Sequence, residues 1–224
     1  MGEKIVAAVC AYNEEGWIAS VLKPLLEAKR SGLLDDILVV DDGSEDMTGQ
    51  IAEAFRVNVI RHEKNLGKAR AFMSAVDYCN KAGADILFLS DADMLNLTED
   101  KIGGFLAKVR GNPDVWMMRA PYFQGGKTCA AQLSGFRALR LSRLADHMSS
   151  DKWREVTGLG GFSLEIALES CIPETHKGED DSLGLKSRPA GAGASGLEKI
   201  ASQAKAAGRL TGIAVEGYYS GGKR

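Results

Sequence analysis

Several features that would assign this sequence to a class of proteins are missing. No apolar run approaches the roughly 18 residues that a transmembrane helix needs, and the start "MGEKIVAAVC" shows no signal-peptide pattern. Lys and Arg number 28 against 30 for Asp and Glu, so the net charge of −2 offers no basic excess for nucleic acid. These absences favour a soluble, cytoplasmic protein without a nucleic-acid partner, and they leave peripheral membrane contact open.

Motifs built on cysteine or glycine are missing too. The four cysteines (Cys10, Cys79, Cys129 and Cys171) are far apart and form no CxxC pair. We therefore expect free, largely buried thiols in a reducing compartment. The sequence also has no GxxxxGK[ST] loop and no GxGxxG after its first apolar run. A phosphate site in this protein must therefore be made in another way.

What the first 120 or so residues do contain is an alternation of short apolar runs with segments of helical periodicity. Such alternation is typical of βαβ units, which build a parallel sheet flanked by helices. Strands are expected at 4–10, 36–40, 57–60, 85–90 and 115–120. The helix at 14–29 has an apolar stripe that includes Trp17, which we place in the core, and Pro24 should kink it. The pattern predicts an α/β fold with a mostly parallel central sheet.

The pattern changes after residue 125. Residues 132–148 have the periodicity of a helix that carries Arg137, Arg140 and Arg143. These arginines would offer a cationic face to a phosphate-bearing acceptor, but an exposed charged helix face is the commoner cause of such spacing. From residue 189 the chain is rich in Gly and Ala, which predicts a flexible C-terminal segment at 189–224. The remaining residues, 1–188, are expected to form one domain with halves at 1–120 and 121–188.

Acidic clusters follow three of the expected strands, in "AYNEE", "DDGSED" and "DADM". The carboxyl ends of parallel strands lie at one edge of a sheet, where ligands bind in open α/β folds. The clusters should therefore share a rim made by Glu14, Asp41, Asp42, Asp91 and Asp93. Two unit charges about 5 Å apart repel by roughly 3 kcal/mol at an effective dielectric of about 20. Since magnesium is usually held by one or two carboxylates plus substrate phosphates, the rim favours a metal–diphosphate site.

A complementary anion site is indicated by "NLGKARA", where Gly67 and Lys68 begin an expected helix. Backbone N–H groups at a helix start, together with a lysine, suit a phosphate. The turn at Asp42, Gly43 and Ser44 would present a carboxylate to a base or ribose. Each feature also has an ordinary explanation, which is a surface lysine for the first and an Asx-turn for the second.

Four segments resemble the nucleotide-sugar-binding half of family 2 glycosyltransferases with the GT-A fold. They are "VAAVCAYNEEGWIASVL", "ILVVDDGSEDMTGQIAE", "VIRHEKNLGKARAF" and "DILFLSDADM", in the family's order and spacing. The resemblance covers residues 4–120 strongly and 121–186 loosely. It implies a Rossmann-like GT-A domain that moves a sugar from a nucleotide diphosphate sugar to a small or lipid-phosphate acceptor, with Mg²⁺ or Mn²⁺ as cofactor.

The resemblance also implies roles for individual residues. The substrate-binding positions would be Ala11, Tyr12, Asn13, Glu14, Asp42, Gly43, Ser44, Gly67, Lys68, Asp91, Ala92 and Gly160. Asp91 and Asp93 form the DxD motif for ribose and the cation, with Asp93 as the direct metal ligand and His176 completing the metal shell. Glu165, in "GLGGFSLEIALES", would be the base of an inverting enzyme or an acceptor clamp in a retaining one.

Two other functions stay open. A sugar-nucleotide pyrophosphorylase shares the strand order and an acidic metal site, but "AYNEE" stands where its GxGTR loop would be. A non-catalytic nucleotide-sugar-binding domain is the other, because the segment after residue 188 is shorter and richer in Gly and Ala than the family's acceptor elements. The absence of the "ED" and "QxxRW" signatures argues against a processive polysaccharide synthase.

Ordinary explanations also exist for the remaining site residues. Asp91 and Asp93 would then belong to a solvated loop, Glu165 and Glu169 to a wet helix face, and His176 to an exposed loop. The sequence does not specify the sugar, the base, the acceptor or the stereochemical outcome, and it leaves a homodimer open.

Overall fold

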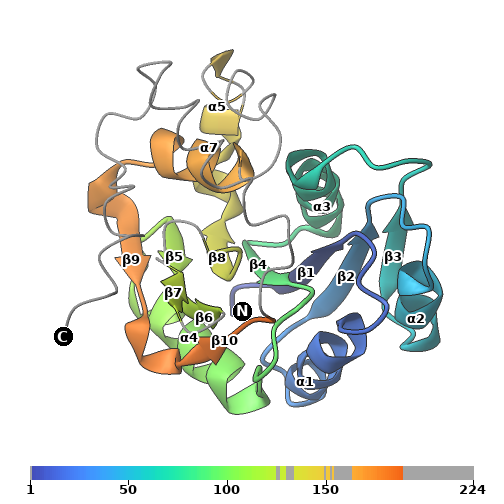
Figure 1. Ribbon diagram of the computed structural model, residues 1–224. Coiled ribbons are helices and arrows are strands. Elements are labelled where there is room, and N and C mark those ends of the chain that lie inside the picture. Colours follow the sequence, from blue (N-terminus) through green and yellow to red (C-terminus); the bar gives the residue numbers. More distant parts are fainter. Residues whose placement is uncertain are drawn as a thin grey trace.

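The computed structural model describes residues 2–124, 127–129, 134–148, 150, 151, 153 and 163–188. Its centre is a seven-stranded sheet with the order β3-β2-β1-β4-β8-β5-β9 (Figure 1). The strands are β1 (Ile5–Ala11), β2 (Asp36–Asp41), β3 (Asn58–Arg61), β4 (Ile86–Asp91), β5 (Met117–Arg119), β8 (Arg137–Arg140) and β9 (Lys177–Glu179). Strands β1 to β4 pair in parallel, β8 is antiparallel to both β4 and β5, and β9 is parallel to β5. The expected mostly parallel sheet is confirmed.

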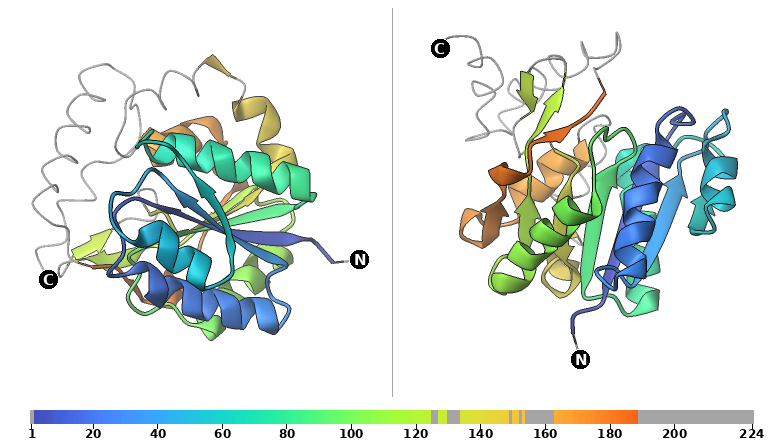
Figure 2. Two further views of the ribbon diagram at one scale, coloured as in Figure 1. Left: turned by 90° about the vertical axis from the view of Figure 1, so that its right-hand side faces the viewer. Right: turned by 90° about the horizontal axis from the view of Figure 1, so that it is seen from below.

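Helices cover both faces of this sheet (Figure 2). One face is covered by α1 (Ile18–Arg30), α2 (Thr48–Ala54) and α4 (Glu99–Gly111). The other is covered by α3 (Lys68–Ala82) and α7 (Ser163–Cys171). Short helical segments η2 (Leu141–Arg143), α5 (Ala145–Met148), η3 (Glu174–His176) and η4 (Asp181–Leu183) complete the helices of the described residues. Along this described part of the chain, no helix is both long enough and apolar enough to cross a membrane.

A second, three-stranded sheet brings a late segment of the chain to the DxD loop. It has the order β10-β6-β7 and consists of β6 (Tyr122–Gln124), β7 (Lys127–Cys129) and β10 (Leu185–Lys186). Just beyond β10, Ser187 forms an antiparallel bridge with Met94, and the N–H of Arg188 donates to the carbonyl of Asp93. The end of the described chain is therefore fixed beside Asp93.

The central strands are buried on both faces, as their uninterrupted apolar runs predict. In β1, alternate residues face two separate core clusters, with Val9 in one and Ala8 in the other. Phe88, Phe105 and Phe136 form an aromatic group in the first cluster, with ring centroids 5.0 to 5.9 Å apart. This packing joins β4, α4 and the residues just before β8, and so it supports the strand that ends in the DxD motif.

The helix expected at 132–148 is wrong for residues 134–140, whereas η2 (Leu141–Arg143) and α5 (Ala145–Met148) are helical. Residues 137–140 form β8, whose two central side chains face opposite core clusters, as in any buried strand. Arg137 and Arg140 are buried rather than exposed. The i, i+3 spacing of the arginines, which suggests one helix face, places Arg137 and Arg140 on opposite faces of the strand. Pairing with β4 and β5 makes this segment a strand. Trp17 is also misplaced by the sequence, since it precedes α1 and is 37% exposed.

Three further expectations are confirmed at most in part. α1 continues as one helix through Pro24. Cys10, Cys79 and Cys171 are free thiols, whereas the side chain of Cys129 is not described. The segment 189–224, for which we expect flexibility, lies outside the described residues.

The aromatic group predicts a large loss of stability when Phe88 is truncated. Phe88 is fully buried, so Phe88→Ala should lower the free energy of unfolding by about 3–5 kcal/mol through lost burial and a residual cavity. Chemical denaturation measures this value. The control is Met47→Ala at a position that is 58% exposed, where a change within about 0.5 kcal/mol is expected. Equal losses at the two positions would contradict the assigned core.

Candidate active site

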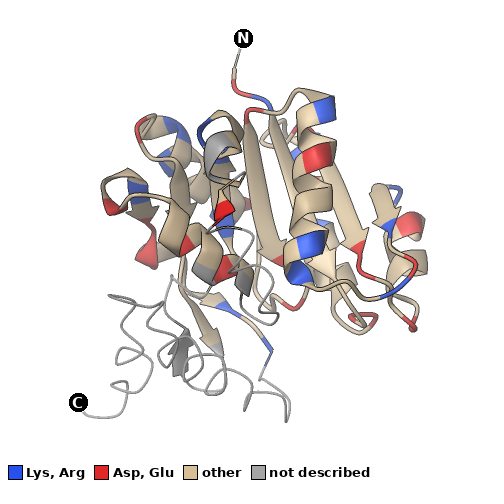
Figure 3. Ribbon diagram, turned by 90° about the horizontal axis from the view of Figure 1, so that it is seen from above, with Lys and Arg blue, Asp and Glu red and all other residues tan. Residues whose placement is uncertain are grey.

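The ends of the parallel strands bring the acidic clusters together. Cys10 and Ala11, the last residues of β1, are in register with Asp91 of β4 and Asp41 of β2. Figure 3 shows acidic residues at the carboxyl ends of neighbouring strands. The rim expected from the sequence is therefore present, and its chemistry depends on which cations meet these carboxylates.

Lys68 is the innermost of these cations. Its Nζ lies 2.7 Å from Asp91 Oδ1 and 2.7 Å from Glu165 Oε1, so it joins the start of α3 to the end of β4 and to α7. Burial by itself would lower the pKa of Lys68, but the carboxylates of Asp91 and Glu165 raise it above its ordinary value. Glu165 is 1% exposed, and among the described residues its Oε2 accepts no hydrogen bond. The structure thus brings Lys68, from the half at 1–120, into contact with Glu165, the expected base.

A small cavity adjoins this ion bridge. Cys10, Lys68, Asp91, Arg137 and Glu165 contribute to its lining. Burial raises the pKa of the Cys10 thiol to about 12, so this thiol is neutral. The cavity is therefore bordered by two cations and two carboxylates but by no nucleophilic thiolate.

Gly135 makes the close approach of the chain to Asp91 possible. Its N–H donates to Asp91 Oδ2 at 3.2 Å, and a Cβ at this position would lie 2.1 Å from Asp91 Oδ1. Any side chain would push the carboxylate away from Lys68. Sequence reasoning missed Gly135, although a glycine directly before a buried strand is a known signal of close backbone approach.

A second cation, Arg188, lies in the outer corner of the rim. Its Nη2 is 2.7 Å from Glu14 Oε1, and its Nε is 3.5 Å from Asp93 Oδ2, which also accepts from Ser187 Oγ at 3.1 Å. Burial raises the pKa of Glu14 to about 7 against the lowering effect of Arg188, and nearby Asp93 raises it further. Burial and Asp91 likewise raise the pKa of Asp93. The outer corner therefore remains short of positive charge.

Asp42 is used within the protein rather than presented to solvent. Its carboxylate accepts hydrogen bonds from the N–H groups of Leu66 at 3.0 Å and Gly67 at 2.7 Å. Oδ1 also lies 2.6 Å from Nδ1 of His62, whose Nε2 is 2.9 Å from Ser74 Oγ. Asp42 thereby fixes the loop that leads to Lys68. The expected contact with a nucleoside would require this carboxylate to share or exchange its partners.

The first two strand-end loops are tied into one unit. The N–H of Asn13 donates to Ser44 Oγ at 3.0 Å, and the N–H of Ser44 donates to Asp41 Oδ1 at 2.9 Å. Gly43 has a φ of 73°, and a Cβ there would lie 2.3 Å from the backbone of Lys64. Glycine is therefore required at this turn, next to the expected base-binding residues.

The remaining expected substrate contacts differ in what their side chains can reach. Tyr12 is 41% exposed and leaves its ring available at the rim. Ala11 and Ala92 are buried in the core, so only their backbone groups could meet a ligand. Gly160 lies outside the described residues.

His176 does not reach the acidic rim. Its ring stacks on Trp116 with centroids 4.2 Å apart, and Nδ1 lies 3.0 Å from the carbonyl oxygen of Asp114. Pairing through β8 and β5 places His176 level with Ile86 at the start of β4. Five strand residues, about 16 Å, then separate it from Asp91. The prediction that His176 is a metal ligand is therefore wrong. His176 precedes β9, and the end of β9 that faces the rim is its carboxyl end, not its start.

A divalent cation would have to rely on few protein ligands. Within the described ranges, no three His, Cys, Asp or Glu side chains converge to hold a metal ion by themselves. Glu14 Oε2 is nevertheless buried without a hydrogen-bond partner in the described structure, close to Asp93 with its raised pKa. This donor set fits an ion held by one or two carboxylates and completed by diphosphate oxygens.

Comparison with known proteins identifies the family. A model of the family described as glycosyl transferase family 2 matches residues 7–161. The chain is 30% identical over 118 residues to a UDP-N-acetylglucosamine–dolichyl-phosphate N-acetylglucosaminyltransferase of Methanococcus voltae, which covers 45% of each protein. It is 47% identical over 73 residues to an uncharacterized protein of Methanocaldococcus jannaschii, covering 30% of each. The chain thus matches less than half of the length of these curated relatives.

Solved structures agree on the fold. Glucosyl-3-phosphoglycerate synthase from Mycobacterium tuberculosis, in complex with Mn²⁺ and UDP-glucose, has a TM-score of 0.68 at 21% identity, covering 94% of this chain and 81% of that one. Mannosyl-3-phosphoglycerate synthase from Rubrobacter xylanophilus has a TM-score of 0.69 at 16% identity, covering 95% and 77%. The GT-A fold expected from the sequence is confirmed, and the chain belongs to glycosyl transferase family 2.

Proposed function

We propose that the chain is a metal-dependent glycosyltransferase that moves a sugar from a nucleotide diphosphate sugar to an acceptor. The observation that carries this proposal is the partly buried ion bridge from Lys68 to Asp91 and Glu165 at the carboxyl ends of the strands. Family membership supports the reaction class. The site has the three parts that the reaction needs, namely a cation for the leaving diphosphate, carboxylates for a metal and a buried carboxylate for the acceptor.

The donor would bind along the rim. The exposed ring of Tyr12 is available to pack against the base. The first turn of α3, which begins at Lys68, offers backbone N–H groups and the Lys68 ammonium to the phosphates, whereas the N–H of Gly67 is held by Asp42. Asp93 and Glu14 would hold Mg²⁺ or Mn²⁺, which when bound offsets the charge that develops on the leaving diphosphate. The Mn²⁺ named in the mycobacterial complexes supports this choice of cofactor.

Lys68 and Glu165 would then act in sequence. Before the donor binds, the Lys68 ammonium is paired with the carboxylate of Glu165. An incoming phosphate offers Lys68 a stronger anionic partner, which leaves the Glu165 carboxylate free to accept the proton of the acceptor hydroxyl. In a retaining enzyme the same carboxylate would only orient the acceptor.

A phosphate-bearing acceptor is supported by the named relatives. One mycobacterial complex contains UDP-glucose together with phosphoglyceric acid, and the Methanococcus voltae relative is named for dolichyl phosphate. Arg137, for which the sequence offers contact with such an acceptor as the less common alternative to an exposed helix face, is instead buried and paired with Glu169. The acceptor phosphate must therefore be met by other groups, and the acceptor remains either a small molecule or a lipid phosphate.

The first test is donor turnover by the Asp93→Asn variant. Hydrolysis of a panel of nucleotide sugars with Mn²⁺ needs no knowledge of the acceptor. Because a metal supplies several kcal/mol of charge stabilisation, Asp93→Asn and EDTA should each lower turnover at least about 100-fold. Asp114→Asn, an exposed aspartate at the opposite end of the sheet, is the matched control and should retain turnover.

Each of the other outcomes would indicate a different mechanism or function. Full activity in EDTA or in Asp93→Asn would contradict the metal-dependent mechanism. Nucleotide-sugar binding without turnover would indicate a non-catalytic domain. Release of a nucleoside triphosphate that depends on added pyrophosphate would indicate a pyrophosphorylase.

A second prediction concerns Arg188, whose guanidinium occupies the corner between Glu14 and Asp93. Arg188→Gln removes a cation that competes for these carboxylates. Partly exposed ion pairs contribute about 0.2–1 kcal/mol, so Mn²⁺ affinity without nucleotide should rise by a factor of about 1.4 to 5. Calorimetric titration with Mn²⁺ measures this change, and Arg110→Gln, on the outer end of α4, is the control. Unchanged or weaker Mn²⁺ binding by Arg188→Gln would show that the metal does not use this corner.

A further inference from the structure

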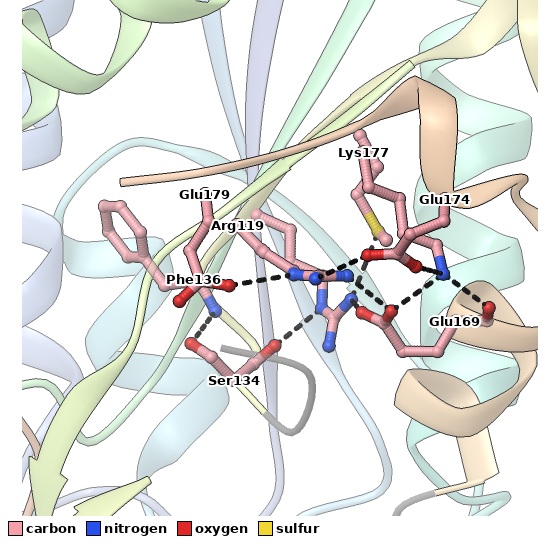
Figure 4. A network of polar contacts seen from close by, with 9 residues as sticks. Arg119, Ser134, Phe136, Glu169, Glu174, Lys177 and Glu179 are labelled. Atoms are coloured by element: carbon pink, nitrogen blue, oxygen red, sulfur yellow. Dashed lines mark hydrogen bonds and ion pairs between the residues drawn. The ribbon is translucent and has the colours of Figure 1, made fainter. Parts of the chain in front are cut away.

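A buried charge network lies between α7 and the sheet, outside the residues that take part in the proposed chemistry (Figure 4). Glu169 is at its centre, and we call it the Glu169 network, made by Glu169, Arg119, Arg137 and Lys177. Glu169 Oε1 accepts from Arg137 Nη1 at 2.8 Å, and Oε2 accepts from Arg119 Nη1 at 2.5 Å. Lys177 Nζ lies 3.2 Å from Oε2 and donates to the backbone carbonyl of Glu169 at 2.8 Å.

Each member of the network comes from a different element. Glu169 is on α7, Arg119 on β5, Arg137 on β8 and Lys177 on β9. Arg119 and Arg137 are 4% and 1% exposed, so their charges have lost almost all contact with water. Buried charges persist only when they are paired. One carboxylate therefore fixes α7 to three strands of the sheet.

The network lies one helical turn from Glu165. Residues four positions apart lie on the same face of a helix, and Glu165 meets Lys68 on this face as Glu169 meets the arginines. Arg137 even lines the same cavity as Lys68 and Glu165. The rotation and height of α7 that let Glu169 reach both arginines are the same that bring Glu165 to Lys68.

We propose that Glu169 is a positioning residue for glycosyl transfer, which acts by holding α7 where Glu165 reaches the reacting centre. This inference rests on the role proposed above for Glu165. Apolar contacts of α7 with α3 would allow small rotations, whereas hydrogen bonds between charged groups are directional. Glu169 therefore sets the geometry of the expected base without touching substrate.

The kinetic test uses Glu169→Gln, which keeps the size of the side chain and removes its charge. The value of kcat should fall about 100-fold, as expected for a displacement of roughly 1 Å at the reacting centre, while KM for the donor stays unchanged. In a Glu165→Gln background the same substitution should cost little more, because it acts through Glu165. Losses that multiply in the double variant would overturn the proposal.

The matched control is Glu174→Gln. Glu174 contacts Arg119 and Lys177 from the outside with a side chain that is 75% exposed, so its kcat should equal that of the parent. If Glu169→Gln does not fold, Glu169→Asp takes its place, since it keeps the charge and shortens the reach. A kcat of Glu169→Asp equal to the parent value would also overturn the proposal.

A readout without substrate separates this inference from the proposed function. A double-mutant cycle of Lys68→Met and Glu165→Gln, followed by chemical denaturation, measures the coupling between the two side chains. This coupling should be lost in the Glu169→Gln background, and a coupling that persists unchanged would contradict the positioning role. If the parent shows no turnover but the coupling is lost, the proposed function fails and the geometric inference stands.

Discussion

The site depends on one interaction, the partly buried ammonium of Lys68 between the carboxylates of Asp91 and Glu165. Parallel strands that end in acidic residues place like charges on one rim, where they repel strongly in a medium of low dielectric. A lysine at the start of α3 offsets this repulsion from inside the protein. Because its partners come from β4 and α7, the same ion bridge also joins the two halves of the chain. The Lys68 ion bridge thus both offsets the repulsion between the carboxylates and joins the elements that form the site.

The inner and outer corners of the rim differ in how closely a cation approaches their carboxylates. The inner corner has a cation with two carboxylate partners at short distance, whereas the outer corner has Arg188 at 2.7 Å from Glu14 but 3.5 Å from Asp93. Burial, together with neighbouring carboxylates, raises the pKa of Glu14 and of Asp93, and Arg188 offsets this only in part. A preorganised site gains most where its charges are not yet balanced. The outer corner is therefore the part of the rim that an added cation would stabilise.

The sequence predicts what depends on local pattern and on strand ends. The parallel sheet and the acidic rim that includes Asp91 follow from apolar periodicity and strand ends. Glu165 is named only through the family resemblance, and the sequence does not predict that it meets Lys68 and Asp91 in one ion bridge. Prediction from the sequence fails where pairing between distant segments decides the structure. β8 resembles a helix until it lies between β4 and β5, and His176 resembles a metal ligand until β9 places it at the wrong end of the sheet. No sequence spacing indicates that Arg188 meets Glu14, 174 residues away.

On the donor side, hydrogen bonds to the backbone fix the loops of the site. On the acceptor side, the orientation of α7 must be fixed by other directional contacts. The loops around Asp42 and Ser44 are held by hydrogen bonds to main-chain N–H groups next to parallel strands. In the described part of the chain, the backbone of α7 meets the sheet through the carbonyl of Glu169, which accepts from Lys177 Nζ of β9. Its apolar residues Leu164 and Leu168 pack through non-directional contacts. A buried carboxylate between two arginines supplies directional contacts, at the cost of burying charge. Helix α7, which carries Glu165 as the expected base, is therefore positioned by electrostatics rather than by packing alone.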